Sequence, residues 1–399
     1  MLISISLMLL VGMFSGWICR KLKLPSLLGM MLTGVILGPY VLNLIDVSIL
    51  NISSDLRKIA LIIILTRAGL TLNLNDLKKV GRPAVLMCFI PATFEIIGMI
   101  VLAPKLFGVS ILEAAVTGTV VGTVSPAVIV PKMSKLIDEG YGTNKCIPQL
   151  ILTGASVDDV FVIVLFTAFT GLAHGKQISV MSFVNIPVSI CLGIVIGLLL
   201  GSLLFKFFAK VHIRDTVKVI TILSISFILI TVEDNITGNI TLSALIAIMF
   251  IGIAKQKCSK DVSARLSLKF NNLWVCAEIL LFVLVGATVD IHYVTSAAIP
   301  AILLIFSVLC FRMIGVFLCL LHTKLSLKER LFCMIAYTPK ATVQAAIGGV
   351  PLAMGLACGN IVLTIAVMAI LVTAPLGAFL IELTYRKLLQ YDLAENFIK

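Results

Sequence analysis

Almost the whole chain is divided into apolar blocks of about twenty residues, the length that an α-helix needs to cross the hydrocarbon core of a bilayer. Of its 399 residues, 60% are hydrophobic and only 13% are charged, whereas about a quarter of the residues in a soluble domain carry a charge. Because lipid offers no hydrogen-bond partner to an unpaired backbone amide, the blocks are expected to be helices. The sequence therefore predicts an all-α polytopic membrane protein.

We predict thirteen transmembrane helices, which form a single transmembrane domain over residues 1–399. The first block begins at Leu2 without a basic stretch before it, and we interpret it as a spanning helix and not as a signal peptide. The predicted spans, whose ends are set to within a few residues, are 2–19, 25–44, 57–73, 83–104, 110–133, 148–173, 180–208, 216–232, 240–256, 271–289, 297–321, 330–357 and 360–385.

Basic residues are unequally distributed between the loops that join these spans. The odd-numbered loops contain 21 of the 31 lysines and arginines, and the even-numbered loops contain only Arg57, Lys58, Lys105 and Lys176. Under the positive-inside rule, the N-terminus is outside, the C-terminus is cytoplasmic, and the protein is expected in the plasma membrane. The net charge of +12 is then a topology signal, and no nucleic-acid partner is predicted.

Cysteine and histidine give no sign of a metal or redox site. The ten cysteines lie mostly inside apolar segments without CxxC spacing, as expected for small buried hydrophobic residues. The four histidines fall near predicted helix ends, and no nucleophile–base pair is visible. We therefore expect no disulfide framework, no resident metal or cofactor, and no enzyme.

Short motifs recur in the two halves of the chain at one interval. Gly69 precedes Glu95 by 26 residues, and Gly286 precedes Arg312 by 26 residues. The matching segments are 69–74 with 286–291, 94–98 with 311–315, and 125–127 with 339–341. Matched helices differ by seven in serial number, so the two copies must cross the membrane in opposite directions. The sequence predicts two inverted-topology repeats, approximately 1–173 and 216–385, linked by span 180–208, an arrangement typical of secondary transporters.

Several charged residues fall inside the predicted spans, where insertion costs at least about 3 kcal/mol each. They are Glu95, Arg312, Asp158, Asp159, Lys340, Arg67 and Glu278. Asp158 and Asp159 lie about a dozen residues into their span, and adjacent helical residues point roughly 100° apart. One carboxylate can therefore line a cavity while the other contacts a neighbouring helix. A carboxylate that binds either a proton or a hard cation is the minimal requirement for exchange.

A proline lies near the middle of two spans at equivalent positions of the repeat, Pro126 and Pro339. Proline removes one helical hydrogen bond and clashes with the preceding turn, so both helices are expected to be broken inside the membrane. Such breaks leave helix-dipole ends that bind ions or need compensation. Lys340 is positioned to neutralise the C-terminal ends.

The remaining charges have structural interpretations. Glu95 and Arg312 occupy equivalent repeat positions and are expected to form a buried ion pair. If Arg312 instead pairs with Asp158, Glu95 is left free to bind a proton, and the sequence does not choose between these pairings. Arg67 is expected to snorkel, and Glu278 is expected near the start of span 271–289, at the membrane interface.

These residues resemble the monovalent cation:proton antiporter superfamily, most closely its NHA branch of sodium/proton exchangers. The similar segments run from the second span to the twelfth and are 24–29, 67–70, 124–131, 140–142, 158–159 and 338–345. The resemblance implies an NhaA-like antiporter fold with crossed broken helices, a homodimer, and a core that moves against a dimerisation part.

The resemblance also implies roles for individual residues. Asp159 would be the main ion and proton carrier with Asp158 as its companion, and Lys340 would balance the crossing helix ends. Arg312 would pair with Glu95 and not with Asp158. The residues that would help to line the site are Ser125, Thr342, Thr123 and the backbone near Val124.

The sequence thus predicts a secondary transporter in which Na⁺ or Li⁺ competes with H⁺ for a buried aspartate. If Asp158 also titrates, two protons accompany each cation and transport is electrogenic; if Asp158 stays charged, exchange is one for one. A K⁺/H⁺ antiporter of the same fold, a sodium-coupled organic-anion symporter and a passive channel are the alternatives. The adjacent carboxylates disfavour an anion as substrate because they would repel it.

Overall fold

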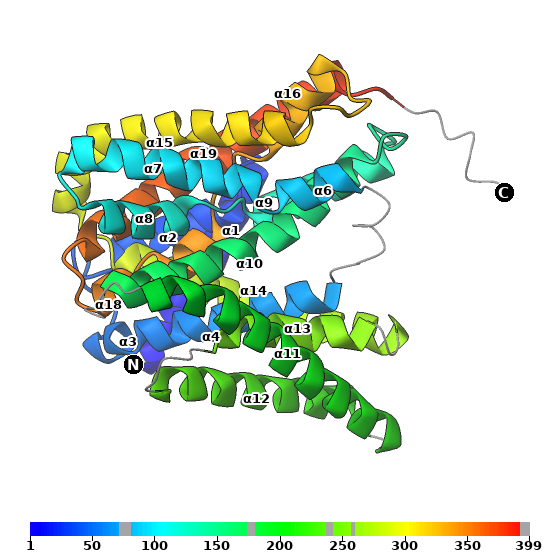
Figure 1. Cartoon of the computed structure of the whole chain (residues 1–399). Helices are drawn as coiled ribbons and strands as arrows, with labels where there is room; N and C mark the ends of the chain where they lie inside the picture. Colours follow the sequence, from blue (N-terminus) through cyan, green and yellow to red (C-terminus); the bar gives the residue numbers. More distant parts are fainter. Residues whose placement is uncertain (72–80, 174–179, 212, 237–241, 257–259, 392–399) are drawn as a thin grey trace.

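Helices form most of the described molecule, and the long ones run side by side (Figure 1). The computed structural model describes residues 1–71, 81–173, 180–211, 213–236, 242–256 and 260–391. Among these residues the only β-type pairing is an isolated bridge between Tyr141 and Tyr391. The beginning of α1 (Leu2–Lys21) and the end of α19 (Gly359–Leu388) lie at opposite ends of the bundle. The prediction of an all-α protein is confirmed.

Each of the thirteen predicted ranges overlaps a helix or a set of consecutive helices. The other described helices are α2 (Ser26–Leu37), α3 (Val47–Asn51), α4 (Ser53–Thr71), α6 (Arg82–Met87), α7 (Ile90–Phe107), α8 (Ile111–Val121), α9 (Pro126–Asp138), α10 (Ile147–Ala173), α11 (Val180–Lys210), α12 (Asp215–Asn235), α13 (Ala244–Gln256), α14 (Lys260–Ala287), α15 (Ile291–Cys319), α16 (Leu327–Ala336), α17 (Thr342–Ile347) and α18 (Val350–Ala353). By length and composition, nine stretches of the described residues can cross a membrane.

Two helix boundaries differ most from the predicted ranges. Helix α2 ends at Leu37 and not near residue 44, because Pro39 restricts Gly38 to the extended conformation that it adopts here, with ψ of 174°. Helix α14 begins at Lys260 and not near residue 271. Its first turns are polar, so hydropathy does not detect them, and Arg265 in this extension forms an ion pair with Asp215 at 2.9 Å.

Some predicted features lie outside the described residues. They are positions 72–74 of the first repeat motif, residues 240–241 of the ninth predicted span, and the loop lysines Lys78, Lys79, Lys176 and Lys257.

Two helices are interrupted near their middle, as the prolines predict. Helix α8 ends at Val121 and α9 begins with Pro126, and α16 ends at Ala336 while α17 begins at Thr342. The two breaks meet, because the backbone N–H of Ser125 donates a 2.8 Å hydrogen bond to the carbonyl of Pro339. The prediction of two broken helices is confirmed.

Close helix pairs surround these breaks. Helix α7 packs along α15, and α4 packs along α14. A Cβ atom on Gly98 of α7 would lie 2.8 Å from Phe311, and one on Gly315 of α15 would lie 2.9 Å from Pro91. Each helix thus uses a glycine to approach the other. These two glycines follow Glu95 and Arg312 by the same three residues, so the charged side chains are held at this tight contact.

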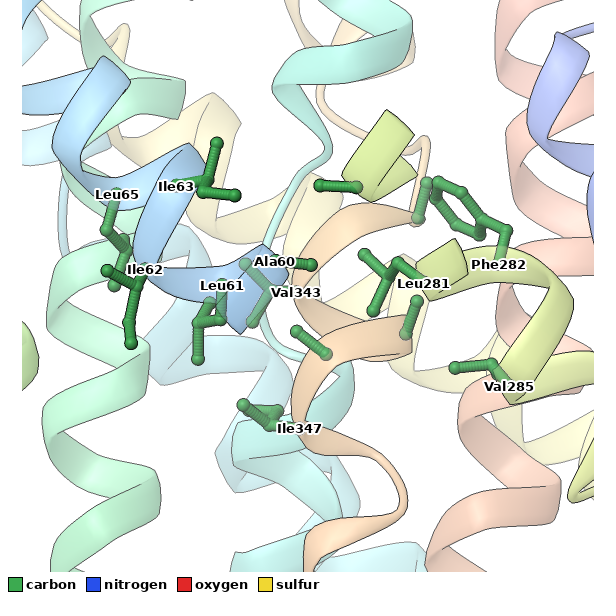
Figure 2. Packing of buried hydrophobic residues seen from close by; sticks show 14 of the residues in the cluster. Ala60, Leu61, Ile62, Ile63, Leu65, Leu281, Phe282, Val285, Val343 and Ile347 are labelled. Atoms are coloured by element: carbon green, nitrogen blue, oxygen red, sulfur yellow. The ribbon is translucent and has the colours of Figure 1, made fainter. Parts of the chain in front are cut away.

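The half-helix α17 is seated against the α4–α14 pair. Figure 2 shows Val343 and Ile347 of α17 between the apolar side chains of α4, such as Ala60, and those of α14, such as Leu281. Val343 is 3% exposed and Ile347 is 2% exposed. Because these side chains occupy one face of α17, the neighbouring residue Gln344 is directed away from this apolar contact and towards the other break.

Candidate ion-binding site

Four of the charged residues that the sequence places inside the membrane are paired with one another where the two breaks meet. Helix α10 supplies Asp158, helix α7 supplies Glu95, helix α15 supplies Arg312, and the break between α16 and α17 supplies Lys340. All four side chains are 0% exposed. Charges with no access to water persist in a protein interior only when they are paired and hydrogen-bonded, so each partner of these four groups matters.

Arg312 connects most of this cluster. Its Nη2 donates to Asp158 Oδ2 at 2.6 Å and its Nη1 donates to Glu95 Oε2 at 2.8 Å. Its Nε donates to the carbonyl of Tyr337 at 2.7 Å, and Nη1 also donates to the carbonyl of Gly122 at 2.7 Å. A planar guanidinium with five N–H donors suits such a junction. The residues alone left two pairings open for Arg312, and the structure contains both of them. The resemblance implied that Arg312 pairs with Glu95 and not with Asp158. The first part of this expectation agrees with the structure, and the second part is wrong.

Lys340 contacts a carboxylate and not the carbonyl groups of the broken helices. Its Nζ donates to Glu95 Oε2 at 2.6 Å. The carbonyls at the C-terminal ends of α16 and α8, those of Tyr337 and Gly122, accept from Arg312. The hydrogen bonds at these ends are thus made by Arg312, and the role predicted for Lys340, to neutralise the helix ends, stays a prediction. The planar arginine guanidinium has several N–H donors and can approach both helix ends at once, whereas the lysine ammonium is a compact point charge.

Asp158 and Asp159 are neighbours with different environments. Asp158 Oδ2 accepts from Arg312 and also from the backbone N–H of Val124 at 3.1 Å. Asp159 is 8% exposed, and no hydrogen bond or ion pair to its carboxylate is present among the described residues; its Oδ1 is buried without a partner. The 100° between adjacent helical side chains produces this contrast. The two adjacent aspartates therefore differ in their hydrogen-bond partners.

Buried oxygen atoms without a hydrogen-bond partner gather on the predicted site residues. In the described part of the chain these atoms include Ser125 Oγ, Asp158 Oδ1, Asp159 Oδ1 and Glu95 Oε1. A buried acceptor without a partner is costly unless water or an ion satisfies it. Carboxylate and hydroxyl oxygens are the ligands that hard cations prefer. The arrangement can thus offer oxygen ligands to a partly dehydrated monovalent cation.

The other predicted lining residues lie at the breaks. Thr123 is 0% exposed, and its hydroxyl accepts a 2.9 Å hydrogen bond from Gln344 Nε2. Thr342 is 3% exposed at the first position of α17. Gln344 was not among the residues predicted for the site. A neutral amide inside an apolar helix is the signal that could have found it, because a buried amide requires partners for both of its ends.

Arg67 and Glu278 belong to a separate electrostatic contact, between α4 and α14. Glu278 interacts electrostatically with Arg67 and Arg20. Because α14 begins at Lys260, Glu278 lies well inside this helix. The predicted start of this helix was wrong because its polar extension was missed, whereas the expected place of Glu278 at the membrane interface stays a prediction.

No group of three or more His, Cys, Asp or Glu side chains that could hold a metal ion occurs among the residues that the structure places. The site therefore offers two adjacent carboxylates and neutral oxygens, a set that suits a weakly held monovalent cation more than a resident divalent one.

Comparison with known proteins finds a family match over almost the whole chain. A family profile described as "Sodium/hydrogen exchanger, transmembrane" matches residues 5–387. Sodium/hydrogen exchanger 9B2 from Homo sapiens is 32% identical over 380 residues, which cover 92% of this chain and 70% of that protein. Sodium/hydrogen exchanger 9B1 from Homo sapiens is 30% identical over 387 residues and is covered to 74%.

Among solved structures, the sodium proton antiporter MjNhaP1 from Methanocaldococcus jannaschii at pH 8 superimposes with a TM-score of 0.84. The match covers 96% of this chain and 97% of that one, at 22% sequence identity. This similarity establishes an NhaP-type antiporter fold, in agreement with the all-helical bundle and its two broken helices.

Proposed function

Because this chain belongs to the sodium/hydrogen exchanger family of the monovalent cation:proton antiporter superfamily and exchanges Na⁺ for H⁺, we propose that Asp159 carries the two ions in alternation. The family is one of transporters and not a class of enzymes. The single observation that carries the proposal is the contrast between the adjacent aspartates. Asp158 is bonded to Arg312 and Val124, whereas Asp159 is bonded to no described residue and is therefore available.

Exchange follows from competition at one carboxylate. Protonated Asp159 is neutral and does not attract a cation, and ionised Asp159 provides an oxygen ligand for Na⁺ or Li⁺. The further ligands that we propose are Ser125 Oγ, Asp158 Oδ1, Thr342 and backbone near Thr123 and Val124. The buried core then presents the loaded site to each side of the membrane in turn, as in other transporters built from broken helices.

We propose that one proton is exchanged for one cation. Asp158 and Glu95 are matched by Arg312 and Lys340, so this cluster of two acids and two bases needs no additional proton. Removing one partner from a buried pair leaves an uncompensated charge, which costs about 3–5 kcal/mol. Protonation of Asp158 would have that effect on Arg312. Asp158 accordingly stays ionised through the cycle, and Asp159 is the one carboxylate that binds the proton and the cation in turn.

The proposed architecture has thirteen transmembrane helices in two inverted repeats, approximately 1–173 and 216–385, joined by span 180–208. Equivalent contacts in the two halves support it. Gly69 of α4 lies against Met249 of α13, and Gly286 of α14 lies against Met31 of α2, each with 2.1 Å between a built Cβ and a carbonyl oxygen. In the repeat, α4 corresponds to α14 and α13 to α2, so these two contacts are the same contact made twice.

The proposed setting is a plasma membrane with the N-terminus outside and the C-terminus cytoplasmic, in a homodimer. The excess of basic residues in the odd-numbered loops supports this orientation. The exposed apolar side chains of α1, among them Leu10, Phe14 and Trp17, are suited to contact lipid or a second subunit.

Proteoliposomes test the function. Vesicles with a proton gradient and a pH-sensitive dye should lose the gradient on addition of Na⁺ or Li⁺, and Asp159→Asn should abolish this response. Asp138→Asn, which removes an exposed acid from the end of α9, is the matched control and should behave as the unmodified protein. Full activity of Asp159→Asn removes Asp159 from the mechanism. A response to K⁺ in place of Na⁺ indicates the potassium antiporter, and sodium-dependent uptake of a radiolabelled organic anion indicates the symporter.

A further inference from the structure

The side-chain amide of Gln344 joins the two helix breaks. Its Nε2 donates to the carbonyl of Thr123 at 3.1 Å and to the hydroxyl of Thr123 at 2.9 Å, with a longer bond of 3.3 Å to the carbonyl of Val121. Its Oε1 accepts from the backbone N–H of Ala341 at 2.8 Å. The residue is 1% exposed, so these contacts are made without competition from bulk water.

These bonds satisfy opposite ends of two half-helices. The carbonyls of Val121 and Thr123 belong to the C-terminal end of α8 and the break that follows it, where carbonyls have no helical partner. The N–H of Ala341 lies immediately before α17, where backbone N–H groups have no helical acceptor. A carboxamide can make both kinds of contact, because it donates at one atom and accepts at the other without carrying a charge.

The segment that Gln344 holds is the segment that presents the proposed ion ligands. Thr123 is followed directly by Val124, whose N–H donates to Asp158, and by Ser125, whose Oγ has no partner among the described residues. On its other side α17 is fixed by Val343 and Ile347 against α4 and α14 (Figure 2). Any displacement of α17 is therefore transmitted through the Gln344 amide to the backbone that carries Ser125.

We propose that Gln344 is a positioning residue for cation exchange, which sets the distance between the two breaks without contacting the ion. This inference rests on the proposed function, in which Ser125 and the aspartates form the ion site. Both polar atoms of the amide are occupied by protein groups, so none is left for a cation. Gln344 also binds the Thr123 hydroxyl, so of the two hydroxyl groups in the break after α8, Ser125 Oγ is the one that remains available for binding.

Two substitutions separate positioning from simple packing. Gln344→Met keeps the volume and removes all of these hydrogen bonds, and we expect kcat/KM to fall roughly tenfold, the effect of about one unsatisfied buried polar group. Because the ion itself loses no ligand, the fall should be the same for Na⁺ and Li⁺, and the selectivity ratio should not change. A changed Na⁺/Li⁺ ratio places Gln344 on the ion and overturns the proposal.

Gln344→Glu should make transport activity depend on pH in a way that a loss of packing alone does not produce. A protonated carboxyl can still accept from Ala341 and donate to Thr123, whereas an ionised carboxylate cannot donate and faces the carbonyls of Val121 and Thr123. Activity should therefore be near normal at acidic pH and should be lost at alkaline pH, and thermal stability in detergent should decrease over the same range. Gln390→Glu adds a carboxylate at an exposed position and is the matched control.

The outcomes of this experiment are distinct from those that test the proposed function. If Gln344→Glu keeps the pH profile of the unmodified protein, or is impaired equally at every pH in both activity and thermal stability, the positioning role is refuted. The proposed function is refuted separately, by activity of Asp159→Asn in the same vesicles. The thermal measurement keeps the test decisive even if Gln344→Glu is inactive throughout.

Discussion

Arg312 Nη2 lies 2.6 Å from Asp158 Oδ2, and both side chains are 0% exposed. The same guanidinium also bonds Glu95 and the C-terminal ends of two half-helices, so one arginine joins α7, α10, α15 and both breaks. Through this contact Asp158 becomes part of the structure that holds the site, while its neighbour Asp159 is left to react.

Substituting the two aspartates should have opposite effects on stability. Asp158→Asn removes the partner of a buried guanidinium, and leaving such a charge partly unpaired costs about 3–5 kcal/mol. Asp159→Asn removes a buried carboxylate that has no described partner, so its thermal stability should equal or exceed that of the unmodified protein. Thermal unfolding of purified protein in detergent measures both. Equal losses of stability for the two variants would contradict this difference between the two aspartates.

Glu95 and Lys340 should show strong energetic coupling. Each single substitution, Glu95→Gln or Lys340→Gln, leaves a buried charge without its 2.6 Å partner, and each should lower the stability markedly. The double variant replaces both charges, and it should lose less stability than the sum of the singles, by about 1–3 kcal/mol. Unfolding measurements on all four proteins give this coupling. Additive effects would show that the pair is not formed.

The transport cycle should be electroneutral. If Asp158 remains paired with Arg312, only Asp159 changes its occupant, and one positive charge leaves as one enters. The rate of Na⁺-driven gradient collapse in proteoliposomes should therefore be the same with and without a valinomycin–K⁺ clamp of the membrane potential. A rate that rises when the potential is clamped indicates a second proton and an Asp158 that titrates.

A pH-dependent contribution to stability should come from Glu329, which lies before the apolar part of α16. Burial opposes ionisation of this carboxyl, but hydrogen bonds from Lys145 and from the backbone and side chain of Ser326 outweigh it and lower its pKa. A lowered folded-state pKa stabilises the fold above the ordinary pKa of glutamate, and this stabilisation is lost as the pH falls through the folded-state value.

Glu329→Gln should therefore unfold at a lower temperature than the unmodified protein at neutral pH, with a difference of about 1–3 kcal/mol. The difference should shrink as the pH is lowered below the ordinary range for glutamate. Melting curves at a series of pH values measure it. A difference that does not depend on pH would show that packing of the glutamate side chain, and not its charge, stabilises this end of α16.

The close approach of α7 and α15 should be sensitive to one methyl group. Gly98→Ala would place a Cβ 2.8 Å from Phe311, and such overpacking costs about 1–3 kcal/mol. Gly171→Ala in α10 is the matched control, because no side-chain or distant backbone atom lies within 4 Å of its built Cβ. The control should be neutral or slightly stabilising, since alanine is the better helix former. Equal losses in the two variants would contradict the role of the glycine in helix contact.

Much of this architecture could be predicted from local chemistry. The length of the apolar blocks identified the helices, and Pro126 and Pro339, at equivalent positions of the repeat, identified the two breaks, because proline removes a helical hydrogen bond and clashes with the preceding turn. The cost of placing charges in lipid indicated that Arg312 would be paired with Glu95 or with Asp158. The structure contains both pairs, and it adds a contact between Lys340 and Glu95 that was not predicted.

The contacts that depend on how helices cross and where their side chains point could not be predicted from the sequence. Arg312 bonds both Glu95 and Asp158 because of the way in which α7, α10 and α15 cross. The spacing of residues within one helix does not encode this geometry. Gln344 carries no charge, so the penalty argument that identified the acids and bases did not apply to it. The start of α14 was misplaced because hydropathy detects the apolar part of a helix, and α14 begins in polar sequence.

The central claim is that H⁺ and Na⁺ compete for Asp159, and the most direct test is the Na⁺ affinity of the purified protein as a function of pH. Calorimetric titration should give an apparent Kd for Na⁺ that rises as the pH falls, with a limiting slope that approaches about tenfold per pH unit, as expected for one proton displaced per ion. Asp159→Asn should bind no Na⁺. An apparent Kd that does not change with pH would contradict the account.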